Sequence, residues 1–516
     1  MKTEKTSATC SVVPALVAVF FAVETCGAMA APRPTGQPVP IDSSMMETSI
    51  FGLGYAGVKP PGLAEAWSRT GVRCIKLANV QWQFLEPRPP SKRGHMYRWN
   101  LMDMIVREYQ HYGFNIQPEL KSKSRWGSKP LQNKLLDIRG AGIASTFPKT
   151  DRIKDFEDFI QAVVERYDGD GVDDMPGLRA PILYYEIESE AQHEATWQGT
   201  AEEYIRMLRI GRQAALRANP DVKIILAGIN LGDIYDDFPT PGVVAQRFAE
   251  ILKARRRDRE FIDATLKAED AYDIVEFHYN RDYTGIYGTV EHIRKFTNKT
   301  IWAGDATSAP YLQALPGIDF NPYCPRERGK EFYEKIVAGD REVAAWFRAE
   351  QARLTAKKFI CAAEMGLKKV NMQFTAPWKP TAGVGTFHQN FFVMNMVEQD
   401  LSPLPVYYTI KTLVEKIDGF TAVQRLDLGH KGFYAYRFTV DGKPVYALWL
   451  EDGVQQMPGE KQASREAELD IGAGQARVTV IVTDLEQTQP RSQIMPTSKG
   501  KLSLSVTETP VFVEPQ

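Results

Sequence analysis

Cysteine is scarce in this chain, and neither sign of charge dominates. The 516 residues include five cysteines, and two of them, Cys10 and Cys26, lie within the first 30 residues. The remaining three allow one disulfide at most, which excludes a scaffold held together by disulfides. The 63 Lys and Arg residues against 64 Asp and Glu residues leave a formal net charge of −1. Such a balance attracts neither nucleic acid nor an anionic membrane surface, so we expect neither as a partner.

Motifs for metals and nucleotides are also missing. The seven histidines are scattered, and no Cys or His spacing resembles a zinc-ligand set. The chain has no strand–GxxxxGK[ST]–helix loop to cradle phosphates. No glycine-rich fingerprint turn follows its first apolar run, which argues against dinucleotide binding. We therefore expect no metal and no cofactor.

The N-terminus has the layout of a secretory signal peptide. Two lysines precede an apolar run over residues 12–23, and a small-x-small cleavage pattern ends at Ala30. The run is too short to span a bilayer comfortably. We predict that segment 1–30 is removed after Ala30, giving a secreted or periplasmic protein with no membrane insertion after cleavage. The proline-rich segment 31–48 is then a linker.

Short apolar runs alternate with amphipathic helical patterns from residue 49 to residue 418. Parallel βαβ units produce this alternation. Their number and span favour an α/β fold of the (β/α)8 TIM-barrel type over residues 49–418, with a doubly wound open sheet as the alternative. The strand candidates are 49–54, 73–78, 114–120, 181–187, 223–228, 273–278, 299–304 and 368–374.

The pattern changes after residue 420. Alternating residues on both sides of the turn at 440–443 indicate a β-hairpin, and further strand-like runs follow to the end of the chain. We predict a small antiparallel β-sandwich-like domain over residues 420–516. A role in stabilising the barrel is favoured over independent ligand binding.

The segment 184–190, Tyr-Tyr-Glu-Ile-Glu-Ser-Glu, is the most informative in the chain. If it is a strand, Glu186, Glu188 and Glu190 point to one side, roughly 6.6 Å apart along it. Like charges on one buried face raise some of their pKa values, which makes them candidates for acid/base chemistry. The alternative is a structural pair, Glu186 and Glu188, followed by a solvated Glu190.

Other strand ends also carry polar or aromatic residues. Lys76, Glu119, His278 and Asp305 lie near the ends of four predicted strands, and Trp378 follows the last one. The chemistry of (β/α)8 barrels occurs at the carboxyl ends of the strands. These residues are therefore expected to face one common site.

Several fragments, in order and at suitable spacing, resemble one family. They are Gly71-Val72 through Lys76 with Trp82 and Glu86-Pro87, residues 185–190, His278-Tyr279, residues 301–305, and Pro405-Val406-Tyr407-Tyr408. Together they resemble the clan A retaining glycoside hydrolases, in particular the β-xylosidase-like branch with a trailing β domain. The resemblance covers nearly the whole chain after the signal peptide. It implies a glycoside hydrolase that cleaves O-glycosidic bonds of an oligo- or polysaccharide with two carboxyl groups.

The resemblance also implies roles for individual residues. Glu190 would be the acid/base, and Asp305 would be the nucleophile or a base. Substrate contacts are expected from Lys76, Trp82, Trp126, Ser189, His278, Tyr279 and Trp378.

Three of these positions depart from the family pattern. Ser189 stands where the family has asparagine, Lys76 where it has arginine, and Asp305 where it has glutamate. A retaining site needs its carboxyl groups about 5–5.5 Å apart, whereas an inverting site needs about 6.5–9.5 Å. Both remain open, as do a non-catalytic carbohydrate-binding protein and a structural envelope protein. The sequence specifies neither the sugar, the linkage nor the oligomeric state.

Overall fold

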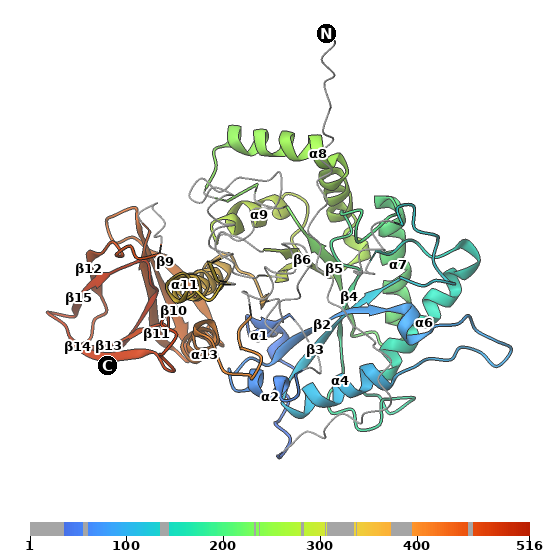
Figure 1. Cartoon of the computed structure of the whole chain (residues 1–516), viewed down its shortest axis with the longest axis horizontal. Helices are drawn as coiled ribbons and strands as arrows, with labels where there is room; N and C mark the ends of the chain where they lie inside the picture. The colour runs from blue at the N-terminus through green and yellow to red at the C-terminus, as the bar shows by residue number, and fades with distance from the viewer. Residues whose placement is uncertain are drawn as a thin grey trace, which may run out of the picture.

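The structure is a computed structural model of the chain (Figure 1). It describes residues 36–54, 60–134, 144–231, 234–236, 238–279, 283–304, 306, 335–336, 338–372, 395–451 and 458–516. Within these ranges, no helix combines the length and the apolar character needed to cross a membrane.

Eight parallel strands form a closed barrel, because β1 pairs with both β2 and β8. This confirms the (β/α)8 prediction and rules out the open sheet. All eight predicted strands are present, with small differences at their ends. They are β1 (Phe51–Leu53), β2 (Cys74–Gln81), β3 (Asn115–Lys121), β4 (Tyr184–Ile187), β5 (Lys223–Ile229), β6 (Ile274–His278), β7 (Thr300–Gly304) and β8 (Lys369–Met372).

Helices follow the strands and cover the outside of the barrel. Their apolar faces pack on the strands in one continuous core, as expected for βαβ units. The main helices are α2 (Leu63–Ser68), α4 (Asn100–His111), α6 (Ile153–Arg166), α7 (Ala201–Ala218), α8 (Pro241–Lys267), α9 (Gly285–Arg294), α11 (Arg341–Glu364) and α13 (Pro405–Ile417).

The amino-terminal end of the barrel is closed by a small apolar layer. Cys74, Ile274 and Trp302 pack there with Met46 of the short helix α1 (Met45–Thr48). Lys369 Nζ lies 2.8 Å from the carbonyl oxygen of Met45 at the base of this layer. Above it, toward the carboxyl ends of the strands, the interior becomes polar, so charged groups are concentrated at the end where barrels carry their chemistry.

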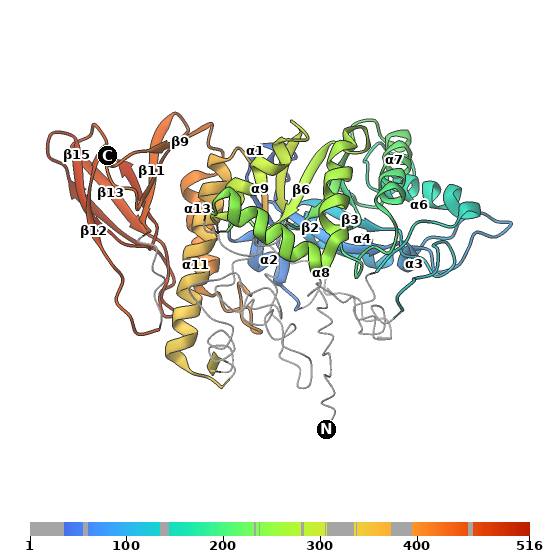
Figure 2. The same ribbon diagram turned by 90° about the horizontal axis from the view of Figure 1, so that it is seen from above.

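The chain continues into an antiparallel β domain, as predicted. A six-stranded sheet has the order β14-β13-β16-β11-β10-β9, and β12 pairs with β15 in a second sheet. Helices α11 and α13 stand between this domain, drawn in red, and the barrel in both views (Figures 1 and 2). Its strands are β9 (Ala422–Leu426), β10 (Phe433–Val440), β11 (Lys443–Leu450), β12 (Arg465–Asp470), β13 (Gln475–Val480), β14 (Arg491–Pro496), β15 (Lys501–Val506) and β16 (Val511–Pro515).

Candidate active site

Strand β4 ends one residue before the second glutamate of the segment 184–190. Ile187 is its last residue, and Glu188 and Glu190 have left-handed backbones with φ of 68° and 43°. A non-glycine residue in this region costs about 1–3 kcal/mol, and such strain concentrates at functional sites. The expectation that three glutamates share one face of a strand is therefore wrong. The two turns send the three carboxylates to three different sets of partners.

Lys76 lies at the centre of the barrel with no exposed surface. Its Nζ is 2.5 Å from Glu186 Oε2, 2.7 Å from Glu276 Oε1 and 3.6 Å from Glu119 Oε2. Burial and the charge of Glu276 raise the pKa of Glu186 well above its ordinary value, although Lys76 opposes them. Burial acts on Glu276 in the same direction, but Lys76 and His278 outweigh it and lower the pKa. Of these two coupled carboxyl groups, Glu186 is therefore the one that holds a proton more firmly, and Glu276 the one that favours the ionised form.

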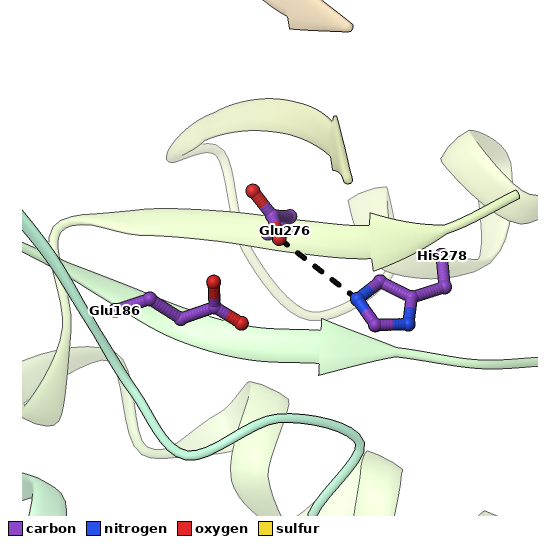
Figure 3. A group of neighbouring side chains, drawn as sticks. All are labelled: Glu186, Glu276 and His278. Carbon is purple, nitrogen blue, oxygen red and sulfur yellow. Dashed lines mark ion pairs between the residues drawn. The ribbon is translucent and has the colours of Figure 1, made fainter. Parts of the chain in front are cut away.

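Glu186, Glu276 and His278 together resemble a metal-ligand set (Figure 3). One ligand atom from each residue lies within 4.8 Å of the others, and His278 Nε2 is 3.9 Å from Glu276 Oε1. The ammonium of Lys76, however, contacts both carboxylates of this group. It supplies the positive charge that a metal would bring, so the arrangement fits an internal counter-ion better than a metal centre.

Glu188 points toward the segment that follows β3. Its Oε1 accepts hydrogen bonds from the backbone N–H of Ser122 at 2.7 Å and from the Ser122 hydroxyl at 2.8 Å. Its Oε2 accepts one from Ser145 and lies 3.7 Å from Lys121 Nζ. These contacts tie the ends of β3 and β4 together, which gives Glu188 a structural role.

Glu190 is buried and is held by residues at the ends of β5 and β6 and by one residue of its own segment. His278 Nδ1 is 2.7 Å from Glu190 Oε1, and Asn230 Nδ2 donates to the same oxygen at 3.0 Å. His193 Nε2 lies 3.9 Å from the other oxygen. Burial alone would raise the pKa of Glu190. The hydrogen bond and charge of His278 outweigh it, with help from His193 and Asn230, and lower this pKa to about 2.

Glu190 is therefore ionised at neutral pH in the free protein. An ionised carboxylate only accepts hydrogen bonds, so the proton of the short contact lies on His278 Nδ1. A carboxylate with an imidazole donor at this distance can exchange a proton along that bond.

Glycines make room for this polar interior. A Cβ at Gly228 of β5 would lie 1.9 Å from His278 Nε2, and one at Gly304 of β7 would lie 2.1 Å from Glu276 Oε1. Any larger residue at either position would displace the His278 or the Glu276 side chain. The two glycines are thus part of what fixes the site.

The aromatic residues predicted to contact substrate lie in different environments. Trp82 is fully buried against Phe159, and its Nε1 donates to Glu86 Oε2 at 2.9 Å. Trp126 is half-buried and packs edge-on against Trp82, with ring centroids 4.7 Å apart. Of these two rings, Trp126 is the one with exposed surface for a sugar, and Trp82 packs against it.

The remaining predicted site residues divide into three groups. His278 and Tyr279 are buried at the end of β6, and half-buried Ser189 stands between the two left-handed glutamates. Lys76 lies beneath the site as a counter-ion rather than at a surface that sugar reaches. Asp305 and Trp378 lie outside the described residues.

Two partners of Glu190 escaped the sequence analysis. Asn230 comes directly after β5, just as Tyr279 comes directly after β6. A position directly after a barrel strand could have marked Asn230 as a site residue. His193 lies in the segment after β4, three residues from Glu190, where no pattern marks it as a partner.

A search of protein-family profiles found no match to this chain, and a search of curated proteins found none either. Solved structures do resemble it. A monomeric β-xylosidase from Caulobacter crescentus CB15 superposes with a TM-score of 0.56 at 12% identity, over 93% of this chain and 97% of that one. A glucosidase from Croceicoccus marinus gives a TM-score of 0.54 at 13% identity, over 93% of this chain and 97% of that one.

A family 39 glycoside hydrolase from the gut symbiont Bacteroides cellulosilyticus WH2 gives the same TM-score of 0.54 at 13% identity, over 93% of this chain and 83% of that one. The likeness covers the barrel and the β domain together. The predicted resemblance to these glycoside hydrolases is thus confirmed for the fold. The chemistry has to be argued from the residues of the site.

Proposed function

We propose that this protein is a glycoside hydrolase and that Glu190 is one of its two catalytic carboxyl groups. The observation that carries the proposal is the position of Glu190. It lies buried, beyond the end of β4, on a left-handed backbone, and within hydrogen-bond distance of His278 and Asn230. Such preorganised partners around a carboxylate at the catalytic end of a barrel support acid/base chemistry on a glycosidic oxygen.

The geometry supports a defined path for the proton. His278 Nδ1 gives its proton to Glu190 Oε1 across 2.7 Å, and Glu190 passes it to the leaving oxygen as the glycosidic bond breaks. Glu190 later takes a proton from the attacking water and returns one to His278. Glu276, whose Oε1 lies 3.9 Å from His278 Nε2, supplies a negative charge that stabilises the imidazolium.

The second carboxyl group in this proposal is Asp305. β7 ends at Gly304, whose Cα pairs with that of His278, and Asp305 is the next residue in the sequence. We assign it the role of nucleophile, or of base in an inverting reaction. Proton NMR of the first-formed sugar distinguishes these roles, because a retaining enzyme releases the anomer of the substrate and an inverting enzyme the opposite one.

A panel of nitrophenyl glycosides and polysaccharides tests the function. We expect turnover of at least one member and its loss in Glu190→Gln and Asp305→Asn, while calorimetry still detects sugar binding to both variants. Sugar binding without turnover in the wild type would replace the proposal by a carbohydrate-binding function. If the wild type neither turns over nor binds any sugar of the panel, a carbohydrate ligand is excluded.

We also propose that the protein is exported. The support is the sequence pattern of segment 1–30, with its basic start, apolar run and small residues before position 31. Protein recovered from outside the cytoplasm and sequenced from its N-terminus is expected to start at Ala31. A chain that retains Met1 in the cytoplasm would contradict this assignment.

A further inference from the structure

Helix α11 carries charged side chains that are almost completely buried. Arg353, Lys357 and Lys358 are 7%, 3% and 1% exposed, and the helix lies between the barrel and the β domain (Figure 2). Buried charges of this kind are retained only when they are paired. Their partners therefore show what the helix connects.

Two of these side chains bind the β domain. Lys357 Nζ lies 3.1 Å from Glu451 Oε2, directly after β11. Arg353 lies 3.3 Å from Glu508 Oε1, and its Nε donates to Thr509 Oγ1 at 2.9 Å. Lys358, the residue after Lys357, contacts the barrel instead.

Lys358 contacts the residue that follows β6. Its Nζ donates to the carbonyl oxygen of Tyr279 at 3.0 Å and lies 4.6 Å from the centroid of the Tyr279 ring. Tyr279 is the immediate neighbour of His278, whose Nδ1 is 2.7 Å from Glu190. Adjacent lysines on one helix thus bind the β domain and the edge of the catalytic site.

The other end of the segment between β6 and α9 is held by the β domain directly. The hydroxyl of Tyr283 donates to Glu451 Oε2 at 2.9 Å, the same oxygen that Lys357 contacts. The Tyr283 ring lies edge-on to Trp449 and Tyr434, with ring centroids 5.9 Å and 5.8 Å apart. Glu451 therefore joins the segment after β6, helix α11 and the β domain at one carboxylate.

We propose that the β domain is a working part of the catalytic site. Glu451 is a positioning residue that holds Tyr283 and Lys357, and the helix of Lys357 binds Tyr279 through Lys358, so that His278 stays in line with Glu190. The catalytic role of this positioning rests on the proposed function. The anchoring of the barrel residues by the β domain does not. A misplacement of about 1 Å in a catalytic group costs roughly 100-fold in rate. Contacts that fix the position of His278 therefore preserve the reaction rate.

Hydrogen–deuterium exchange tests the anchoring without any substrate. In Glu451→Ala, amides of β6 and the start of α9 are expected to exchange at least tenfold faster than in the wild type, with a smaller increase in Glu451→Gln, which keeps an acceptor. Tyr283→Phe removes only the hydroxyl and is expected to loosen the same amides, which covers the case that Glu451→Ala fails to fold.

A second ion pair between the barrel helices and the β domain provides the matched control. Lys416 Nζ of α13 lies 2.6 Å from Glu514 Oε2 of β16. Glu514→Gln is expected to leave exchange in β6 and α9 unchanged. Equal exchange in the Glu451 and Glu514 variants, whether unchanged or raised, would overturn the anchoring.

Kinetics then test the link to catalysis on a substrate found by the panel. Glu451→Ala is expected to lower kcat at least fivefold with KM within twofold, because the sugar contacts remain and His278 moves. Glu514→Gln is expected to keep both constants. If Glu451→Ala accelerates exchange but keeps kcat, the proposal fails while the proposed function stands. If the wild type turns over nothing, the proposed function fails and the exchange result still decides the anchoring.

Discussion

The two cores of this protein are built on opposite principles. Between the sheets of the β domain, the buried side chains are aliphatic or aromatic, with Leu448, Leu469 and Leu502 at the centre. In the upper half of the barrel, the buried side chains include Lys76 and Glu276. The first core gains stability from every group that it buries. The second includes charges whose removal from water is costly and is offset only by one another.

This difference teaches where the protein exchanges stability for chemistry. The charges lie above the apolar layer at the amino-terminal end and below Glu190, and three of the eight described non-glycine residues with positive φ, Asn79, Glu188 and Glu190, lie in the same region. Strain and buried charge are the expected cost of a preorganised site. The apolar core of the β domain lies away from the site and packs as an ordinary sandwich, while Glu451 stands at the boundary with the barrel.

The largest effect is expected from removing the cation of the barrel interior. Lys76→Met leaves Glu276 without its buried ammonium partner, which costs about 3–5 kcal/mol. Urea unfolding followed by circular dichroism measures this loss. The double variant Lys76→Met/Glu276→Gln leaves no stranded charge at Glu276 and is expected to recover most of it. Equal destabilisation in both variants would show that packing, and not charge, sets the cost.

A truncation in the β-domain core is expected to act on stability alone. Leu502 is fully buried on β15, which pairs with β12 in the small second sheet. Leu502→Ala removes packed methyl groups and leaves a cavity, which costs about 2–5 kcal/mol. Turnover per folded molecule is expected to stay within twofold of the wild type. A loss of turnover larger than the loss of folded protein would contradict this separation.

The pH dependence of the unfolding free energy tests the charge of Glu190 in the folded protein. The folded pKa of Glu190 is lowered to about 2. Because the unfolded carboxyl titrates at about 4.3, its stabilising contribution is fully present above that pH and is lost as the pH falls toward about 2. The difference in unfolding free energy between wild type and Glu190→Gln is therefore expected to shrink below about pH 4. A difference that is constant from pH 7 to pH 2.5 would argue against an ionised Glu190.

The smallest effect is expected at the surface of the β domain. Lys501 and Glu468 form an ion pair of 2.6 Å, but their side chains are 50% and 57% exposed. Lys501→Met is expected to leave the unfolding free energy close to that of the wild type, because solvent screens an exposed ion pair. The comparison with Lys76→Met tests burial directly, because both variants remove one lysine that is paired with a carboxylate.

The architecture was accessible from the sequence because apolar runs and amphipathic stretches alternate in a regular order. The edge strands β9 and β14 were not predicted from the sequence, because most of their residues are exposed and show no buried face. The backbone turns after Ile187 also escaped. Nothing in Glu-Ser-Glu marks a left-handed conformation, which usually requires glycine or asparagine.

The sequence predicted which residues of the site lie near the ends of strands, but not which of their side chains contact each other. Glu190 and His278 were both named as candidate site residues, but their hydrogen bond depends on how the barrel closes, which no local pattern encodes. Lys76 was placed at the substrate because the resemblance put an arginine there. Its true depth follows from the small residues around it, such as Gly304, whose missing side chain leaves room for Glu276 beside Lys76.

The central claim, that Glu190 is a catalytic carboxylate, has a direct test in chemical rescue. Glu190→Ala is compared with Glu194→Ala, which removes an exposed carboxylate four residues away, on the best substrate of the panel. We predict that Glu190→Ala loses 10²–10⁴-fold in kcat/KM, as expected for an acid/base group, and that added formate restores part of it, while Glu194→Ala stays within twofold of the wild type. Equal activity of the two variants would contradict the account.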